Sequence, residues 1–271
     1  MKLRYLATDL DGTLLTSAKT ISPRSREVLA QAQRCGMTLI LASGRPLYSI
    51  LPFAEELEMQ KYRGFIISFN GSLVWDCAGG KAIMEQTIPL SLIPDLVAAV
   101  GDGFHIHGYK GNSIVVQGQP DEWSHYIARA NKMPLTETDD FVKTITEAQH
   151  KCLVTGSPRR LWHLERRIGR QFNASLSICR SEPFLLEIMS KGIDKAEALR
   201  WLLNRVGGSP EELMCCGDGY NDLGMMQLAA VSCATAGARK PVKNAATIVT
   251  QSNDRDGVAV AVAEYFPFTS S

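Results

Sequence analysis

The stretch YLATDLDGT at residues 5–13 places a short apolar run directly before two acidic residues. The run Tyr5–Thr8 is typical of a buried strand, and Asp9 and Asp11 follow at its carboxyl end. Ligands of open parallel sheets bind outside the carboxyl ends of the strands. We therefore expect both carboxylates at a binding edge, where a cation or a shared proton relieves their repulsion. The alternative is an ordinary turn, because Asp and Gly are common loop residues.

Strand-like and helix-like patterns alternate on either side of this stretch. Further strands are predicted at residues 38–42 and 65–69, with helices at 22–36 and 46–59 between them. The same alternation returns after Asp194, with a helix to residue 206 and strands near 213–216, 230–234 and 247–250. Continuous apolar strands joined by helices predict an α/β fold, with a parallel sheet covered on both faces.

The middle of the chain has a different order of elements. Strands at residues 105–109 and 114–117 flank Lys110-Gly111-Asn112, which is a hairpin signal. Helices at 92–100, 122–131 and 159–172 alternate with further short strands. This order predicts a small α+β domain with a mainly antiparallel sheet, inserted at residues 84–190. The α/β domain is then discontinuous, comprising residues 1–83 and 191–271.

Composition and charge exclude several classes of protein. The 271 residues are 45% hydrophobic and carry 29 basic against 28 acidic side chains, a formal charge of +1 at pH 7. Such a chain is not disordered and has no electrostatic footprint for nucleic acid or anionic membranes. Seven cysteines without CxxC spacing favour reduced thiols. With no signal-like or membrane-spanning apolar segment, we expect a cytoplasmic globular protein, whose oligomeric state the sequence does not determine.

A second acidic cluster, GDGYND at residues 217–222, again follows an apolar strand. Asp218 and Asp222 would join Asp9 and Asp11 at the same edge of the sheet. Together they form an all-oxygen site of the kind that Mg²⁺ prefers. Alone, the cluster also fits a solvated turn before a helix. Two acidic clusters at two strand ends favour the metal site.

Two weaker signals point to a bound phosphate. Ser43-Gly44-Arg45 follows the second strand, where a hydroxyl group and backbone N–H groups form a natural anion cradle, although a helix cap is the alternative. Lys195 opens the helix after Asp194 and could offset phosphate charge. Taken alone, Lys195 reads better as a solvated surface residue, and Lys191 competes for its role.

These motifs follow one another in the order found in phosphatases of the haloacid dehalogenase (HAD) superfamily, which the chain resembles. The large insertion, together with Ser43-Gly44-Arg45-Pro46 and Asn70-Gly71, is similar to the Cof-type phosphatase subgroup. The resemblance covers nearly the whole chain. It implies a Rossmann-like HAD core, formed by residues 1–83 and 191–271, and a mobile cap for substrate specificity at residues 84–190.

The resemblance also implies a mechanism. Asp9 attacks phosphorus to form an aspartyl-phosphate, and Asp11 acts as general acid and then as general base. Mg²⁺ is held by Asp9, the backbone carbonyl of Asp11 and Asp218, with Asp222 supporting these ligands. The transferring phosphoryl group or substrate is bound by the backbone N–H of Leu10 and by Ser43, Gly44, Lys195 and Asn221.

The sequence thus predicts a Mg²⁺-dependent phosphatase of small phosphorylated metabolites, such as sugar phosphates or a phosphorylated cofactor like pyridoxal phosphate. The alternatives are a phosphomutase of the same fold and a non-catalytic sensor of phosphorylated metabolites. One departure is Thr235-Ala236-Gly237-Ala238, where the family commonly has Met-Gly-Asn-Ala, yet we expect activity to survive. His105 and His107 share a strand face and are expected to pack or hydrogen-bond, with a metal site as the less favoured alternative.

Overall fold

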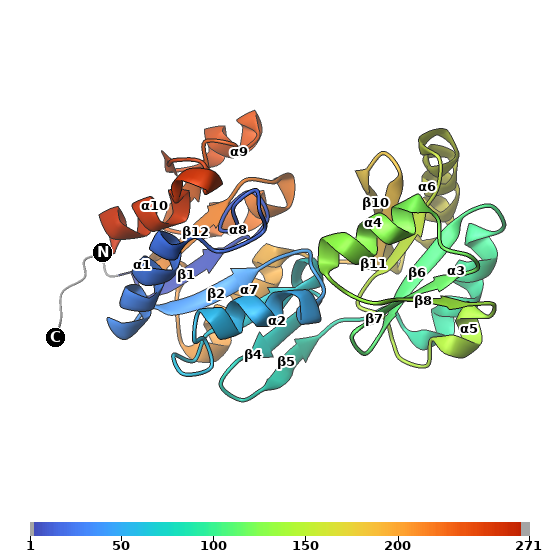
Figure 1. Cartoon of the computed structure of the whole chain (residues 1–271), viewed down its shortest axis with the longest axis horizontal. Coiled ribbons are helices and arrows are strands. Elements are labelled where there is room, and N and C mark those ends of the chain that lie inside the picture. Colours follow the sequence, from blue (N-terminus) through green and yellow to red (C-terminus); the bar gives the residue numbers. More distant parts are fainter. Residues whose placement is uncertain (1–2, 267–271) are drawn as a thin grey trace. The chain divides into compact units, whose positions relative to one another are not determined.

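The computed structural model describes residues 3–266, which divide into two compact units. Residues 1–84 and 194–271 belong to one unit, here called the core unit, and residues 85–193 form the inserted unit. Figure 1 labels most of the helices and strands of both units.

The core unit is built on a sheet of eight strands in the order β14-β13-β12-β1-β2-β3-β4-β5. The six strands from β14 to β3 pair in parallel, and β4 pairs with β3 in the antiparallel sense. Every residue of β1 is buried, as expected for a central strand with helices on both faces. The bounds are β1 Tyr5–Thr8, β2 Thr38–Ala42, β3 Phe65–Ser68, β4 Leu73–Asp76, β5 Lys81–Glu85, β12 Leu213–Gly217, β13 Val231–Ala234 and β14 Ile248–Val249.

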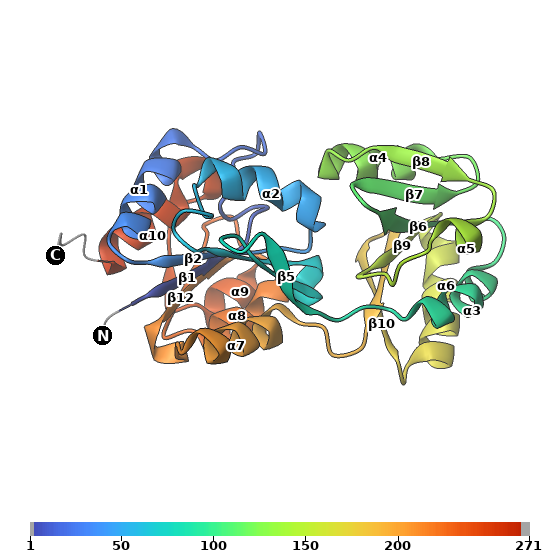
Figure 2. The same ribbon diagram turned by 90° about the horizontal axis from the view of Figure 1, so that it is seen from below.

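Within residues 3–266, six helices cover the two faces of this sheet. In Figure 2, α1, α2 and α10 lie on one face and α7, α8 and α9 on the other. Strand side chains such as Ile40 and Cys215 pack with Leu199 and Leu202 of α7 in one buried apolar cluster. The bounds are α1 Pro23–Arg34, α2 Leu47–Glu56, α7 Lys195–Val206, α8 Leu223–Leu228, α9 Lys240–Ala245 and α10 Gly257–Tyr265.

The strand order reverses direction at the middle of the sheet. From β1 the chain builds outward through β2 and β3, and it returns as β12 on the other side of β1. In open α/β sheets the crevice for ligands opens at such a switch point, outside the carboxyl ends of the strands. The residues after β1 and β12 therefore flank this position.

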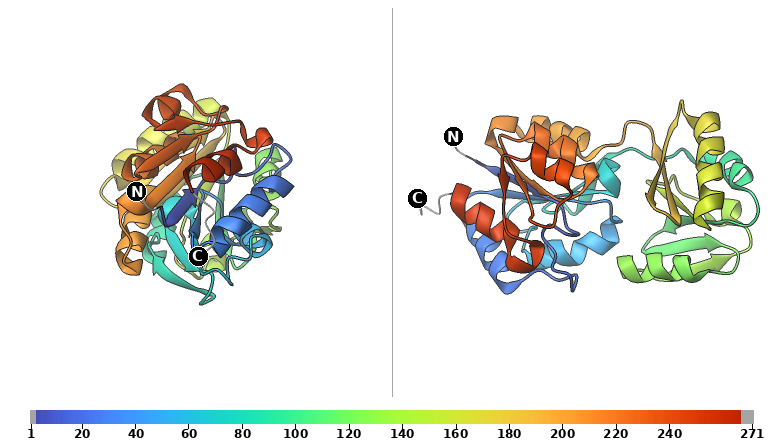
Figure 3. Two further views of the ribbon diagram at one scale, coloured as in Figure 1. Left: turned by 90° about the vertical axis from the view of Figure 1, so that its left-hand side faces the viewer. Right: turned by 90° about the horizontal axis from the view of Figure 1, so that it is seen from above.

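The inserted unit has a sheet of six strands in the order β10-β11-β9-β6-β7-β8. All of its pairs are antiparallel except β7 with β8. Helices α3, α5 and α6 pack on one face and α4 on the other (Figure 3, right). The bounds are α3 Ile93–Val100, β6 His105–Lys110, β7 Ser113–Gln117, α4 Glu122–Asn131, β8 Leu135–Thr138, α5 Phe141–Thr144, β9 Cys152–Thr155, α6 Pro158–Phe172, β10 Leu176–Glu182 and β11 Leu185–Ser190.

The predicted α/β class with an α+β insertion is confirmed. Strands β1 and β2 and helix α4 have the predicted bounds, and the other predicted elements differ by a few residues at their ends. The sequence analysis missed β4, β5, β8, α5 and α9, which are short and carry no clear periodicity. Within residues 3–266, no helix combines the length and the apolar character that a membrane crossing requires.

Candidate active site

The predicted catalytic and binding residues lie at one edge of the core sheet, just after the carboxyl ends of the parallel strands. Asp9 follows β1, Ser43 follows β2 and Asp218 follows β12. Asp9 is tied to the neighbouring strand because its backbone N–H donates to the carbonyl of Cys216 at 3.0 Å. The two predicted acidic clusters therefore meet at the switch point of the sheet.

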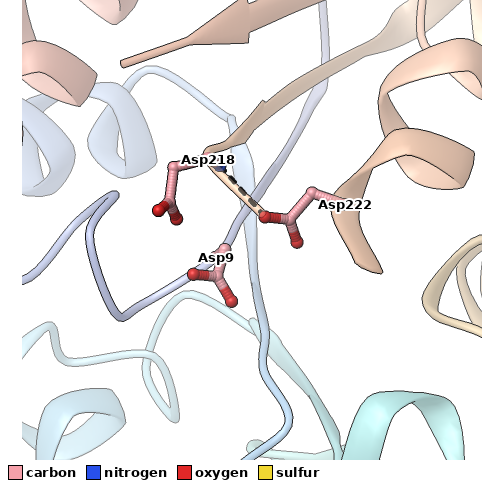
Figure 4. A group of neighbouring side chains, drawn as sticks. All are labelled: Asp9, Asp218 and Asp222. Carbon is pink, nitrogen blue, oxygen red and sulfur yellow. Dashed lines mark hydrogen bonds between the residues drawn. The ribbon is translucent and has the colours of Figure 1, made fainter. Parts of the chain in front are cut away.

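Three carboxylates converge there, as Figure 4 shows. Asp9, Asp218 and Asp222 each present an oxygen, and these three oxygens all lie within 4.8 Å of one another. Asp9 and Asp222 are buried, with 7% and 1% of their surface exposed, and Asp218 is half-buried. The side chain of Asp11 does not belong to this group.

Lys195 is the cation of the cluster. Its ammonium group donates to Asp9 Oδ1 and to Asp222 Oδ1, at 2.7 Å each, and its side chain is fully buried. The local sequence explains its position, because Asp194 accepts the N–H of Ala196 as the N-cap of α7 and makes Lys195 the first helical residue. Lys191, the competing candidate, donates instead to the carbonyl of Asn173 in the inserted unit.

Burial is the largest influence on the pKa values of Asp9 and Asp218. Burial raises the pKa of Asp9, with Lys195 opposing this shift and the charges of Asp222 and Asp218 adding to it. Burial also raises the pKa of Asp218, although the hydroxyl of Thr13 donates to it at 2.9 Å. Burial acts to lower the pKa of Lys195, but the two carboxylates outweigh it and the pKa rises.

The donor set fits a hard divalent cation. Three carboxylates against one ammonium group leave a surplus of negative charge, and hard divalent cations prefer oxygen ligands. A bound divalent cation would offset the burial and the neighbouring negative charges that raise the pKa values of Asp9 and Asp218. Asp9 and Asp218 are the side chains best placed to hold it.

Asp222 has a different set of partners from the other two acids. Its Oδ2 accepts the backbone N–H groups of Asp218 and Gly219 at 3.0 and 2.9 Å, and its Oδ1 accepts Lys195. With both oxygens engaged, Asp222 orients the lysine and the loop after β12. The supporting role expected for Asp222 at a metal site stays a prediction.

Asp11 forms a second ionic centre with Arg45, which the sequence analysis did not assign. Arg45 Nε and one terminal nitrogen donate to the two oxygens of Asp11 at 2.6 and 2.8 Å, and Lys19 Nζ donates at 2.6 Å. Partial burial acts to raise the pKa of Asp11, but the bonds from Arg45 and Lys19 outweigh it and hold the pKa at about 2. The Ser43-Gly44-Arg45 motif could have suggested this pairing, since a guanidinium group can form two parallel hydrogen bonds to a carboxylate.

The remaining predicted phosphate ligands lie at the same edge of the sheet. Ser43 is buried, and its hydroxyl accepts the N–H of Arg45 at 3.2 Å. Leu10 turns the chain after Asp9, because its carbonyl accepts the N–H groups of Thr13 and Leu15. Asn221 is exposed in the middle of the helical turn Tyr220–Asp222, which precedes α8.

The departure at residues 235–238 introduces a local contact. The buried hydroxyl of Thr235 donates to the carbonyl of Gly12 at 3.1 Å. This bond joins the end of β13 to the loop that carries Asp9 and Asp11. A methionine at this position has no hydroxyl to make that bond.

His107 has a structural partner in the inserted unit, and the arginines of α6 lie at its surface. His107 is buried, and its Nε2 lies 2.8 Å from the hydroxyl of Ser124. Among residues 3–266, the only group of three or more acidic, histidine or cysteine side chains placed to hold a metal is the one at Asp9. The arginines of α6 are exposed, as expected for a solvated face, and are Arg159, Arg160, Arg166, Arg167 and Arg170.

Comparison with known proteins gives consistent matches over nearly the whole chain. The model of a family described as haloacid dehalogenase-like hydrolase matches residues 6–262. A putative phosphatase of Haemophilus influenzae is 29% identical, over 98% of this chain and 100% of that protein. A 5-amino-6-(5-phospho-D-ribitylamino)uracil phosphatase of Bacillus subtilis is 27% identical, over 97% of this chain and 96% of that protein. Among solved structures, a haloacid dehalogenase-like hydrolase from Bacteroides thetaiotaomicron is 39% identical with a TM-score of 0.94, covering 98% of this chain and 100% of that one.

Proposed function

This chain belongs to the haloacid dehalogenase-like hydrolase family and is a phosphatase, and from this premise we propose that it hydrolyses phosphomonoesters of small metabolites through an aspartyl-phosphate on Asp9. The observation that carries the proposal is the buried Lys195 ammonium group between Asp9 and Asp222, beside a third carboxylate at the sheet edge. Phosphoryl transfer depends mainly on positioning and on charge stabilisation, and these groups supply both.

In the proposed reaction, an oxygen of Asp9 bonds to phosphorus while the bond from phosphorus to the leaving oxygen breaks. Lys195 holds Asp9 in place and contributes positive charge, and Ser43, Gly44 and the N–H of Leu10 bind the transferring group. Water then attacks phosphorus, the bond to Asp9 breaks, and inorganic phosphate leaves.

Asp11 is the proposed proton donor and acceptor of the two steps. With its pKa at about 2, the carboxyl group is ionised near neutral pH while Arg45 and Lys19 hold it. Before it can protonate the leaving oxygen, Asp11 must therefore release Arg45 and Lys19 and take up a proton. It then accepts the proton of the attacking water.

Mg²⁺ is the proposed cofactor. Asp9, Asp218 and the backbone carbonyl of Asp11 would hold it, with Asp222 supporting them through the loop after β12. When bound, the ion supplies charge neutralisation between the anionic substrate and the carboxylates.

The names of the relatives support the proposed substrate class. The Bacillus subtilis relative is named for a ring compound with a phosphorylated ribityl chain. We place the substrate among sugar phosphates and phosphorylated cofactors, with the inserted unit as the proposed specificity cap. A cytoplasmic location stays a prediction, in line with the seven free thiols, all of which lie within the described residues.

The test is phosphate release from a panel of phosphomonoesters, with Mg²⁺ and with a chelator. We expect turnover of at least one sugar phosphate or phosphorylated cofactor, and loss of turnover on metal removal. Mg²⁺ should also raise the thermal midpoint, and less so as pH falls, because the raised pKa values of Asp9 and Asp218 let protons compete with the metal.

The outcomes separate the alternatives. Phosphoryl transfer back to the product without free phosphate would indicate a phosphomutase. Binding of a phosphorylated ligand without any turnover across the panel would indicate a sensor.

Arg45→Met should lower kcat about tenfold, because Asp11 loses its two-point partner and its orientation. Steady-state kinetics on the best substrate of the panel measures the effect. The matched control is Arg26→Met, since Arg26 makes an exposed ion pair with Glu56 at 3.4 Å. Equal kinetics of the two variants would show that Arg45 does not orient Asp11.

A further inference from the structure

The backbone of the turn after β3 adopts a left-handed conformation that residues other than glycine rarely take. Phe69, Asn70 and Gly71 have φ angles of 50°, 58° and 108°, three positive values in succession. For a bulky residue such as phenylalanine this region is strongly disfavoured. Backbone of this kind persists only where its surroundings hold it, and it is concentrated at functional sites.

Two backbone hydrogen bonds hold the turn against the segment after β2. The N–H of Phe69 donates to the carbonyl of Arg45, and the N–H of Asn70 donates to the carbonyl of Ser43, both at 3.0 Å. These bonds lie on either side of Gly44. The turn at residues 69–71 therefore fixes the course of the proposed phosphate cradle.

The same turn lies against the start of α7. A Cβ atom on Gly71 would come within 2.5 Å of the carbonyl oxygen of Asp194, the residue before Lys195. Only glycine permits this approach together with a positive φ. The turn is thus in contact with the segments that carry Ser43 and Lys195.

The side chain of Asn70 extends these contacts to the loop after β12. Its Oδ1 accepts the side-chain N–H of Asn221 at 3.2 Å. The same oxygen would lie 2.9 Å from a Cβ atom on Gly44, so Asn70 occupies the space beside that glycine. Asn70 therefore lies between two residues that are expected to bind the phosphoryl group or substrate.

We propose that Asn70 is a positioning residue of the phosphatase reaction, whose side chain holds Asn221 beside the Ser43-Gly44 segment. The proposal rests on the proposed function. Asparagine suits the position on two counts: it tolerates the left-handed conformation, and its amide oxygen accepts the bond from Asn221. The side chain of Asn221 is then already oriented when the substrate binds, so no side-chain freedom has to be lost during the reaction.

The first experiment is Asn70→Gly, which keeps the left-handed backbone and removes only the side chain. We expect kcat to fall about tenfold with KM within about twofold, and the denaturation midpoint to stay close to that of wild type. Arg63→Gly is the matched control, because Arg63 is exposed, has a φ of 56° and precedes the same strand that Asn70 follows. It should leave kcat and KM unchanged.

A double-mutant cycle with Asn221→Ala tests whether Asn70 acts through Asn221. In the Asn221→Ala background, Asn70→Gly should lower kcat by less than about twofold, since the contact is already absent. Wild-type kcat in Asn70→Gly, or the same tenfold loss in both backgrounds, overturns the proposal. Wild-type protein that turns over nothing in the panel defeats the proposed function itself, and the positioning role with it.

Discussion

Asp9→Asn is expected to lower kcat by about a thousandfold or more, because an amide oxygen is too weak a nucleophile to displace the leaving group from phosphorus. The substituted side chain keeps the shape of Asp9, and its oxygen still accepts the bond from Lys195. Steady-state release of inorganic phosphate measures the loss. Mass spectrometry of acid-quenched enzyme should find phosphate on the Asp9 peptide of wild type and not of the variant.

The fold should persist in this variant. Burial and neighbouring charges raise the pKa of Asp9, so its ionised form opposes folding in the metal-free protein once pH exceeds the ordinary aspartate pKa. The amide removes that charge, and Asp222 still neutralises Lys195. We therefore expect the free energy of unfolding of the metal-free variant not to fall below that of wild type.

Asp76→Asn is the matched control for the Asp9 variant. Asp76 ends β4, and its Oδ1 accepts the backbone N–H groups of Ala78 and Gly79, which an amide oxygen also does. Its kcat should equal that of wild type. Near-normal turnover in Asp9→Asn, with Asp76→Asn also normal, would remove Asp9 from the role of nucleophile.

Lys195→Met should be the most destabilising of these substitutions. It leaves Asp9 and Asp222 buried without their shared cation, and breaking a buried ion pair from one side costs about 3–5 kcal/mol. Activity should fall by about a hundredfold or more, because the phosphoryl group loses a cation and Asp9 loses its anchor. Chemical denaturation and phosphate release measure the two effects.

The stability of the Lys195→Met variant should depend on pH in a definite direction. The pKa of Lys195 is raised in the folded state, so its stabilising contribution is present at neutral pH and is lost only as pH rises through that raised pKa. Without the cation, Asp9 and Asp222 repel one another when ionised, and acid relieves the repulsion by protonating them. Removing Lys195 raises the pKa of Asp9 above its wild-type value of about 7, so the folded variant takes up this proton at a higher pH than wild type does. The deficit in stability against wild type should therefore shrink as pH falls from alkaline values toward 7.

Two further variants complete this test. Lys191→Met removes an exposed lysine that donates to the carbonyl of Asn173, and should change the free energy of unfolding by less than about 1 kcal/mol. Adding Asp9→Asn to Lys195→Met should restore part of the stability and none of the activity. A Lys195→Met protein as stable as Lys191→Met would contradict the buried ionic cluster.

Local sequence patterns predicted much of the fold. The apolar runs of β1 and β2 match the structure residue for residue, because buried central strands need continuous apolar sequence. The end of α7 at Val206 was also predicted correctly, since glycine follows it and commonly ends a helix. Edge strands such as β5, whose residues are exposed or half-buried, carry no such signal and were missed.

The same contrast holds for the candidate site. Acidic residues directly after two strands indicated Asp9 and Asp218 as site residues, since the carboxyl ends of parallel strands lie at the same edge of a sheet. Local motifs left Lys191 and Lys195 in competition and favoured a surface position for Lys195 taken alone. Only the resemblance to the family selected Lys195. The sequence also indicated no partner for Asp11, because Arg45 lies 34 positions away in the chain.

The sequence alone established an α/β chain with an α+β insertion and two acidic clusters at strand ends, because strand and helix periodicity and turn chemistry are local properties. The tertiary structure decided which cations meet these acids: Lys195 between Asp9 and Asp222, and Arg45 against Asp11. Ion pairing acts over a few ångströms in space whatever the separation along the chain, so strand order and helix packing select the partners. The turn at Phe69–Gly71 also depends on the tertiary structure, since its backbone is held by contacts with residues 43–45 and 194 that no local sequence pattern encodes.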